Sequence, residues 1–175
     1  MFRKKIFTYK NKKRIIIFCI VLVFTYTFFI HFNSRNVISV PDKMIIYANK
    51  TEKEVNKQSN EFDKIFKLTN ERFKFTLYSA KDIINDVYVD NLKKQTLGVE
   101  FIYSKKQKLK YFSNFSHNIL EFDKLYFPLI EENKKIDKYS IVHTFQYGYN
   151  NHYINSSMGN LHYSKQLIEI IKNYK

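Results

Sequence analysis

Ile15-Ile-Ile-Phe-Cys-Ile-Val-Leu-Val-Phe-Thr-Tyr-Thr-Phe-Phe-Ile-His-Phe32 is a run of eighteen residues without a formal charge. As an α-helix with a rise of about 1.5 Å per residue, it would be roughly 27 Å long, close to the ~30 Å hydrocarbon core of a bilayer. A helix also satisfies its own backbone polar groups, as lipid requires. The run therefore predicts a single transmembrane helix over residues 15–32.

Basic residues are concentrated before this run. The first fourteen residues contain seven Lys or Arg and no Asp or Glu, whereas only Arg35 and Lys43 are basic in the stretch directly after it. Positive charge beside a span is retained in the cytoplasm. The sequence therefore predicts a basic cytoplasmic tail at 1–14 and an extracytoplasmic carboxyl-terminal part, with the lipid bilayer as a partner.

A cleaved signal peptide is the alternative interpretation of the same region. Its apolar segment is usually about 7 to 15 residues long and is followed by small residues at the cleavage site. The run here is longer, and it ends in the bulky Phe32 followed by Asn33 and Ser34. The sequence favours an uncleaved signal anchor in the cell membrane.

The rest of the chain has the size and composition of one domain. Residues 33–175 number 143, and they contain all sixteen acidic residues and 23 of the 30 basic ones, which leaves about +7. The single cysteine, Cys19, lies in the apolar run, so this part has no disulfide and depends on a hydrophobic core. We expect a connector at 33–42 and an extracytoplasmic domain at 43–175.

The domain is predicted to be α+β, with a mostly antiparallel sheet and two or three helices. Thr51-Glu-Lys-Glu54 matches a capping box and predicts the start of a long helix. The stretch 80–95 fits a helix or a strand. Strands are expected at 44–48, 73–78, 98–103, 108–112, 125–130 and 139–147, a hairpin turn at 104–107, a long polar loop at 148–160 and a closing helix at 167–174.

Three lysines form the candidate binding site. On a strand, Lys106, Lys108 and Lys110 would share one side while Leu109 and Tyr111 occupy the other. Three ammonium groups could bind an anionic envelope polymer, lipid headgroups or an acidic protein. The alternative hypothesis is an edge strand whose lysines prevent pairing with other chains. Nucleic acid is an unlikely partner, because an extracytoplasmic domain of modest charge seldom meets it.

Catalytic and metal-binding patterns are weak throughout. The five histidines lack the spacing of a helical zinc site, and we expect no cofactor. His143 alternates with apolar residues and is predicted to be a hydrogen-bonded core residue. His152 and His162 bracket the expected loop at 148–163, where they could meet.

The leading hypothesis is a membrane-anchored protein without enzymatic activity, whose extracytoplasmic domain binds a protein partner or an envelope component. A small envelope enzyme with its site in the 148–163 loop is the first alternative. The second is an accessory subunit of a larger membrane complex.

Overall fold

The structure is a computed structural model that describes residues 9–33, 38–80, 84–129, 143–150 and 152–174. The chain divides into two units, Met1–Arg35 and Asn36–Lys175, which are described separately. The second unit is called the domain below.

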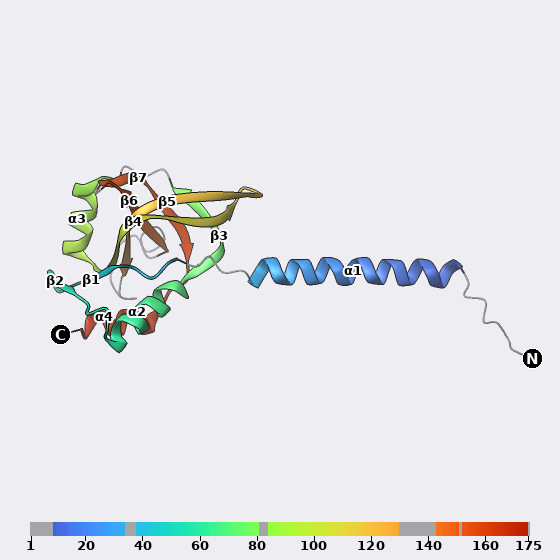
Figure 1. Cartoon of the computed structure of the whole chain (residues 1–175), viewed down its shortest axis with the longest axis horizontal. Helices are drawn as coiled ribbons and strands as arrows, with labels where there is room; N and C mark the ends of the chain where they lie inside the picture. Colours follow the sequence, from blue (N-terminus) through green and yellow to red (C-terminus); the bar gives the residue numbers. More distant parts are fainter. Residues whose placement is uncertain (1–8, 34–37, 81–83, 130–142, 151, 175) are drawn as a thin grey trace, which may run out of the picture. The chain divides into compact units, whose positions relative to one another are not determined.

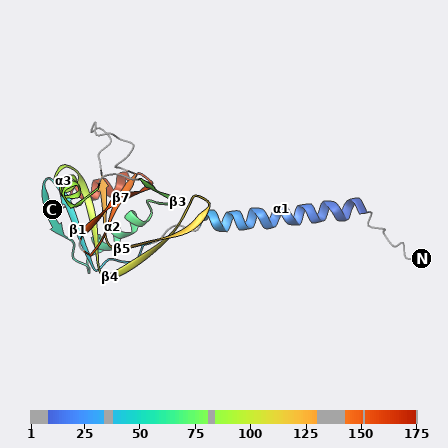
Figure 2. The same cartoon turned by 90° about the horizontal axis from the view of Figure 1, so that it is seen from above.

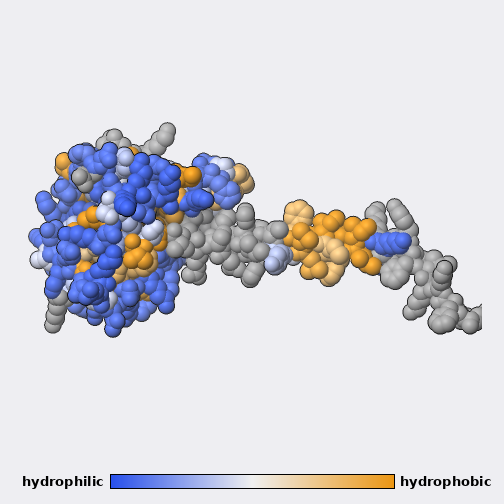
Figure 3. Space-filling model, viewed as in Figure 1, coloured by the Kyte–Doolittle hydropathy of each residue, from blue (hydrophilic) through white to orange (hydrophobic). Residues whose placement is uncertain are grey.

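The first unit contains one helix, α1 (Tyr9–Asn33). The large apolar side chains from Ile15 to Tyr26 are 49–71% exposed, and Figure 3 shows them as a mostly hydrophobic surface. Within the described ranges, no helix meets the length and apolarity that crossing a membrane demands. The predicted transmembrane helix at 15–32 is therefore wrong. The helix also differs in its bounds, because it begins at Tyr9 and includes four of the seven basic residues that were expected to form a separate tail, Lys10, Lys12, Lys13 and Arg14.

A seven-stranded sheet forms the domain (Figure 1). Its strand order is β2-β1-β4-β3-β7-β6-β5, and an additional pairing of β4 with β5 closes the larger part of the sheet on itself. The pairings are antiparallel except for one parallel bridge between Thr76 of β3 and Phe112 of β4. The α+β architecture thus has the large antiparallel sheet that the sequence predicts. The strands are β1 (Lys43–Ala48), β2 (Thr51–Glu54), β3 (Phe73–Ala80), β4 (Leu97–Ser113), β5 (Ser116–Leu129), β6 (Thr144–Tyr149) and β7 (His152–Leu161).

Two helices cover one face of this sheet. α2 (Asn60–Asn70) and α4 (Lys165–Lys172) lie against each other and bury their apolar stripes in the main core. Successive strand residues point to opposite faces, so Phe127 of β5 joins this core while its neighbour Tyr126 does not. The rings of Phe73, Phe101, Phe127 and Phe145 pack with centroid distances of 5.3–6.0 Å.

The third helix of the domain, α3 (Asp86–Gln95), belongs to a second, smaller core on the other face. Its buried residues Val89 and Leu92 pack against Tyr47, Tyr126 and Tyr153 of the sheet. By sequence, the stretch 80–95 fits a helix or a strand, and in the structure it contains the helix α3. The side chain of Asn85 caps the first turn of α3 by accepting a hydrogen bond from the Tyr88 N–H.

The predicted start of the long helix at Thr51 is wrong. Asn49 and Lys50 both have positive φ, which makes a two-residue type I′ turn, and residues 51–54 pair back onto β1 as β2. The helix begins at Asn60 instead, where the Ser59 side chain accepts a hydrogen bond from the Phe62 N–H. A turn and a strand partner override the local capping pattern here.

Two further predictions about loops are wrong. Residues 98–103 and 108–112 belong to the single strand β4, and the chain reverses at Asn114 and Phe115 instead. The expected polar loop at 148–160 is mostly strand, because β6 and β7 form a hairpin there. In the second region β7 also pairs with the distant strand β3, which satisfies a polar backbone that looks loop-like locally. The first half of the predicted strand 139–147 lies outside the described residues.

Candidate functional site

The outer halves of β4 and β5 form a hairpin that extends beyond the rest of the sheet (Figures 1 and 2). We call Ser104–Phe122 the hairpin arm. It begins at a bulge: between the pairs Ile102–Lys124 and Gln107–Phe122, β4 has four residues where β5 has one. Bulges bend a strand and change the direction of its side chains, which accounts for an arm that leaves the sheet at this point.

The two faces of the arm differ sharply. Leu109, Leu120 and Phe122 are buried in the main core. The predicted site residues Lys106, Lys108 and Lys110 are all exposed. The structure therefore places the three lysines on the solvent side, as their alternation with Leu109 predicts, although what they bind stays a prediction.

Glu121 lies between two of the lysines. Its carboxylate oxygens are 3.0 Å from the Lys106 Nζ and 3.3 Å from the Lys108 Nζ. Hydrogen bonds from Lys106 and then Lys108 lower the pKa of Glu121. The Lys106 Nζ also lies 4.1 Å from the centroid of the Tyr149 ring. From Gln107 to Ser113 β4 pairs with β5, and on its other side the described residues give only the bridge between Phe112 and β3. The edge-strand hypothesis for the lysines therefore also stays a prediction.

The tip of the arm carries the most exposed large apolar side chain described in this chain. Phe115 is 97% exposed, and Ile119, opposite Lys110, is 58% exposed. Asn114 and Phe115 have φ of 50° and 60°, which again makes a type I′ turn. Asn tolerates this conformation, but a bulky residue with positive φ is an outlier. Sequence reasoning missed Phe115 because the turn was expected at 104–107.

A second group of polar residues lies under α3. Glu100, whose side chain is 5% exposed, accepts hydrogen bonds from the hydroxyls of Tyr47 at 2.6 Å and Tyr153 at 2.5 Å. The Lys93 Nζ is 2.9 Å from both Glu100 oxygens. The same ammonium lies 4.9–5.7 Å from the ring centroids of Tyr47, Tyr126 and Tyr153. We call these five residues the tyrosine cluster.

The tyrosine cluster is charge-neutral and well satisfied. Burial, followed by the nearby Glu100 carboxylate, raises the pKa of Tyr47 and Tyr153, and burial also raises that of Tyr126. The hydroxyls therefore remain protonated and act as donors toward Glu100. Such an arrangement tethers α3 to the sheet, and nothing in it is poised to react as a nucleophile.

Two of the three glycines make room for this part of the molecule. A Cβ on Gly98 would lie 2.4 Å from the Tyr126 hydroxyl oxygen. A Cβ on Gly148 would lie 2.6 Å from the backbone oxygen of His152 and would also meet the side chain of Lys124, whose Nζ is 4.2 Å from the Tyr153 ring centroid. Close approach of the backbone to these side chains requires glycine at both positions.

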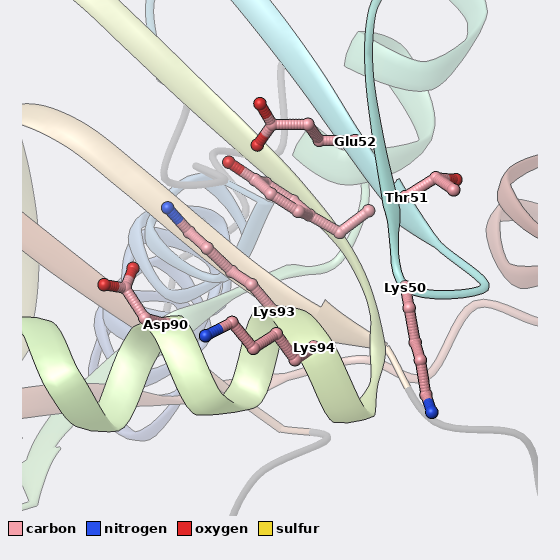
Figure 4. Close-up of a pocket in the computed structure, with 7 residues that line it drawn as sticks. Lys50, Thr51, Glu52, Asp90, Lys93 and Lys94 are labelled. Atoms are coloured by element: carbon pink, nitrogen blue, oxygen red, sulfur yellow. The ribbon is translucent and has the colours of Figure 1, made fainter.

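Two hollows lie beside the tyrosine cluster. The first has about 300 Å³ and includes Tyr47 in its lining. Figure 4 shows Lys93 and Asp90 of α3 pointing into the same space, while Lys50 points away. The second has about 450 Å³ and includes Glu100 and Lys124 in its wall. Both hollows carry charges of both signs, so neither presents a uniform field to a charged ligand.

The predicted histidine pair does not form. His152 and His162 stand at the first residue of β7 and just past its last one, about 30 Å apart at the rise of a strand. The His152 Nδ1 lies 2.8 Å from Asp86 Oδ2, and hydrogen bonds from His152 and then the Tyr153 N–H lower the pKa of Asp86. His143 is half-buried, with its Nδ1 2.8 Å from the Leu161 carbonyl oxygen. Among the described residues, no group of three or more His, Cys, Asp and Glu could hold a metal ion.

The Glu100–Lys93 pair generates a stability prediction. Glu100→Gln leaves the Lys93 ammonium almost buried without its counter-charge, so we expect the free energy of unfolding to fall by about 3 kcal/mol. Urea unfolding followed by tyrosine fluorescence measures this change.

Glu121→Gln is the matched control. It makes the same chemical change at an exposed pair, and we expect a much smaller loss of stability because solvent screens exposed charges. The double variant Lys93→Met/Glu100→Gln should lose less stability than the two single losses added together. Equal losses for Glu100→Gln and Glu121→Gln would contradict the assigned role of the buried pair.

Comparisons of the chain with protein-family models, with curated proteins and with solved structures find no match. The function is therefore proposed from the geometry and chemistry of the described residues.

Proposed function

We propose that the domain is a binding module without enzymatic activity, and that the hairpin arm is the part that contacts a protein partner or an envelope component. The exposure of Phe115 at the tip carries this proposal. Phenylalanine rings contribute strongly to the energetics of protein interfaces, so an almost fully exposed ring on a protruding element supports an interaction site.

The backbone at the tip supports the same proposal. A non-glycine residue in the left-handed region costs roughly 1–2 kcal/mol, and glycine is the usual residue at this turn position. Phe115 thus adds strain without gaining burial in the domain. The ring of Phe115 has no role in the packing of the domain, whereas contact with another molecule would give it one.

The arm is also well supported. Its inner face is anchored in the main core by Leu109, Leu120 and Phe122, so the tip and the lysines stand on a rigid base. Rigid presentation reduces the entropy lost when a partner binds. The tyrosine cluster, by contrast, is internally satisfied and has a structural role in this proposal.

Location is a separate proposal. The exposed apolar side chains from Ile15 to Tyr26 are unfavourable in water, which supports a place at the cell membrane. That the domain lies outside the cytoplasm stays a prediction from the sequence. We expect the full chain to fractionate with membranes, and recovery in the soluble fraction would contradict the membrane location. We also expect protease added to intact cells to digest the domain. Protection of the domain until the cells are lysed would contradict its location outside the cytoplasm.

Strain at the tip gives a testable consequence for stability. We expect Phe115→Gly to raise the free energy of unfolding by about 1 kcal/mol relative to Phe115→Ala, because only glycine relieves the left-handed backbone. Phe115→Ala should stay close to the original protein, since the exposed ring contributes little. Urea unfolding of the three proteins tests this, and a Gly variant no more stable than the Ala variant would refute the strain.

Site-specific crosslinking tests the binding function. The photoreactive phenylalanine analogue p-benzoylphenylalanine at position 115 keeps the aromatic ring, and in intact cells we expect it to give a discrete adduct. The same analogue at Val87, which is 68% exposed on α3, is the matched control and should not give that adduct. Identical adducts at both positions, or none at 115, would argue against the arm as the contact.

A further inference from the structure

We infer that the hairpin arm docks on an anionic lipid surface, with Phe115 entering the interface and the lysines contacting the phosphate groups. This inference rests on the proposed function of the arm and names its partner.

The charge of the arm fits such a surface. Ser104–Phe122 contains four lysines and one glutamate, so its net charge is +3. Glu121 compensates part of the charge of Lys106 and Lys108, which leaves an exposed face that is still cationic. Clusters of lysine beside a membrane are attracted by the negative potential of anionic lipids.

Apolar and basic groups are arranged in order along the arm. Phe115 stands at the tip, the pair Ile119–Lys110 follows, and Lys108 lies opposite Glu121 nearer the base. Lys110 lies three residues before the end of β4 at Ser113, so it is about 10 Å along the strand from the turn that holds Phe115. An inclined arm can therefore place the ring at the hydrocarbon boundary while flexible lysine side chains reach the headgroups.

The shape of the tip favours lipid over an acidic protein. Phe115 lies at the end of a protruding hairpin, is 97% exposed, and lines neither of the two hollows described above. A protein partner would need a recess matched to this ring, whereas a bilayer accepts an apolar wedge without shape matching. Lysine ammonium groups are compact point charges that suit headgroups in many positions. An acidic protein partner is instead an outcome that the experiment can reveal.

A fluorescent label beside the tip reports contact with lipid. The full chain with Cys19→Ser and Ser116→Cys carries one thiol for a nitrobenzoxadiazole label and keeps Phe115. It is diluted from mild detergent into vesicles of phosphatidylcholine alone or mixed with phosphatidylglycerol. Because the label senses only its own surroundings, capture of the chain through another segment does not produce the signal. The matched control is the label at Val87→Cys.

We expect a blue shift at position 116 with the anionic vesicles, a much smaller one with phosphatidylcholine, and none at position 87. Added salt should reverse the shift, because exposed charges are screened. In the labelled chain, replacing Lys106, Lys108 and Lys110 by Gln should raise the lipid concentration for half the shift by on the order of a hundredfold. Phe115→Ser should raise it by roughly tenfold or more.

Three results would overturn the inference: no shift with anionic vesicles, an equal shift with neutral ones, or a shift that the lysine substitutions leave unchanged. If the label fails to shift while the crosslinker at 115 gives a discrete protein adduct, the lipid inference fails and the binding function stands. If both give nothing, the proposed function of the arm fails as well.

Discussion

One strand of seventeen residues, β4, holds the domain together. Its first half pairs with β1 and β5, and its second half pairs with β5 and meets β3 at a single bridge. Val99 and Phe101 point into the main core while Glu100, between them, points to the opposite face. The bulge after Ile102 then redirects the strand into the arm. The register of β4 thus sets both cores and the arm at once.

The two faces of the sheet are stabilised by different physical means. The face under α2 and α4 is a dry core of aliphatic and phenylalanine side chains, for which burial of apolar surface is the main contribution. The face under α3 includes a charged pair, whose desolvation is offset by two tyrosine hydroxyls and three ring faces. The main effect of the charged pair on this second face is therefore to hold α3 in one position on the sheet, and its net contribution to the free energy of folding is small.

The residues that stabilise the domain and those of the proposed binding site are separated in space. The tyrosine cluster satisfies its own donors and acceptors, and its two adjoining hollows have mixed charge. The arm has the opposite character, because it has a net positive charge and its tip has an exposed ring on a strained turn. An element anchored by Leu109 and Phe122 can tolerate that local cost, since the main core supports its base.

The sequence by itself determined the α+β class, the strands near 73–78 and 125–130, the closing helix and the solvent side of the lysines, because these follow from local periodicity. It misplaced the helix at Thr51, the turn at 104–107 and the loop at 148–160, and it predicted a membrane-crossing helix that the structure does not support. Tertiary structure alone decided the tyrosine cluster and the tip. Tyr47, Glu100 and Tyr153 are each 53 residues from the next, and only strand pairing brings them together. Phe115 became the tip because the register of β4 against β5, a non-local property, sets where the chain turns.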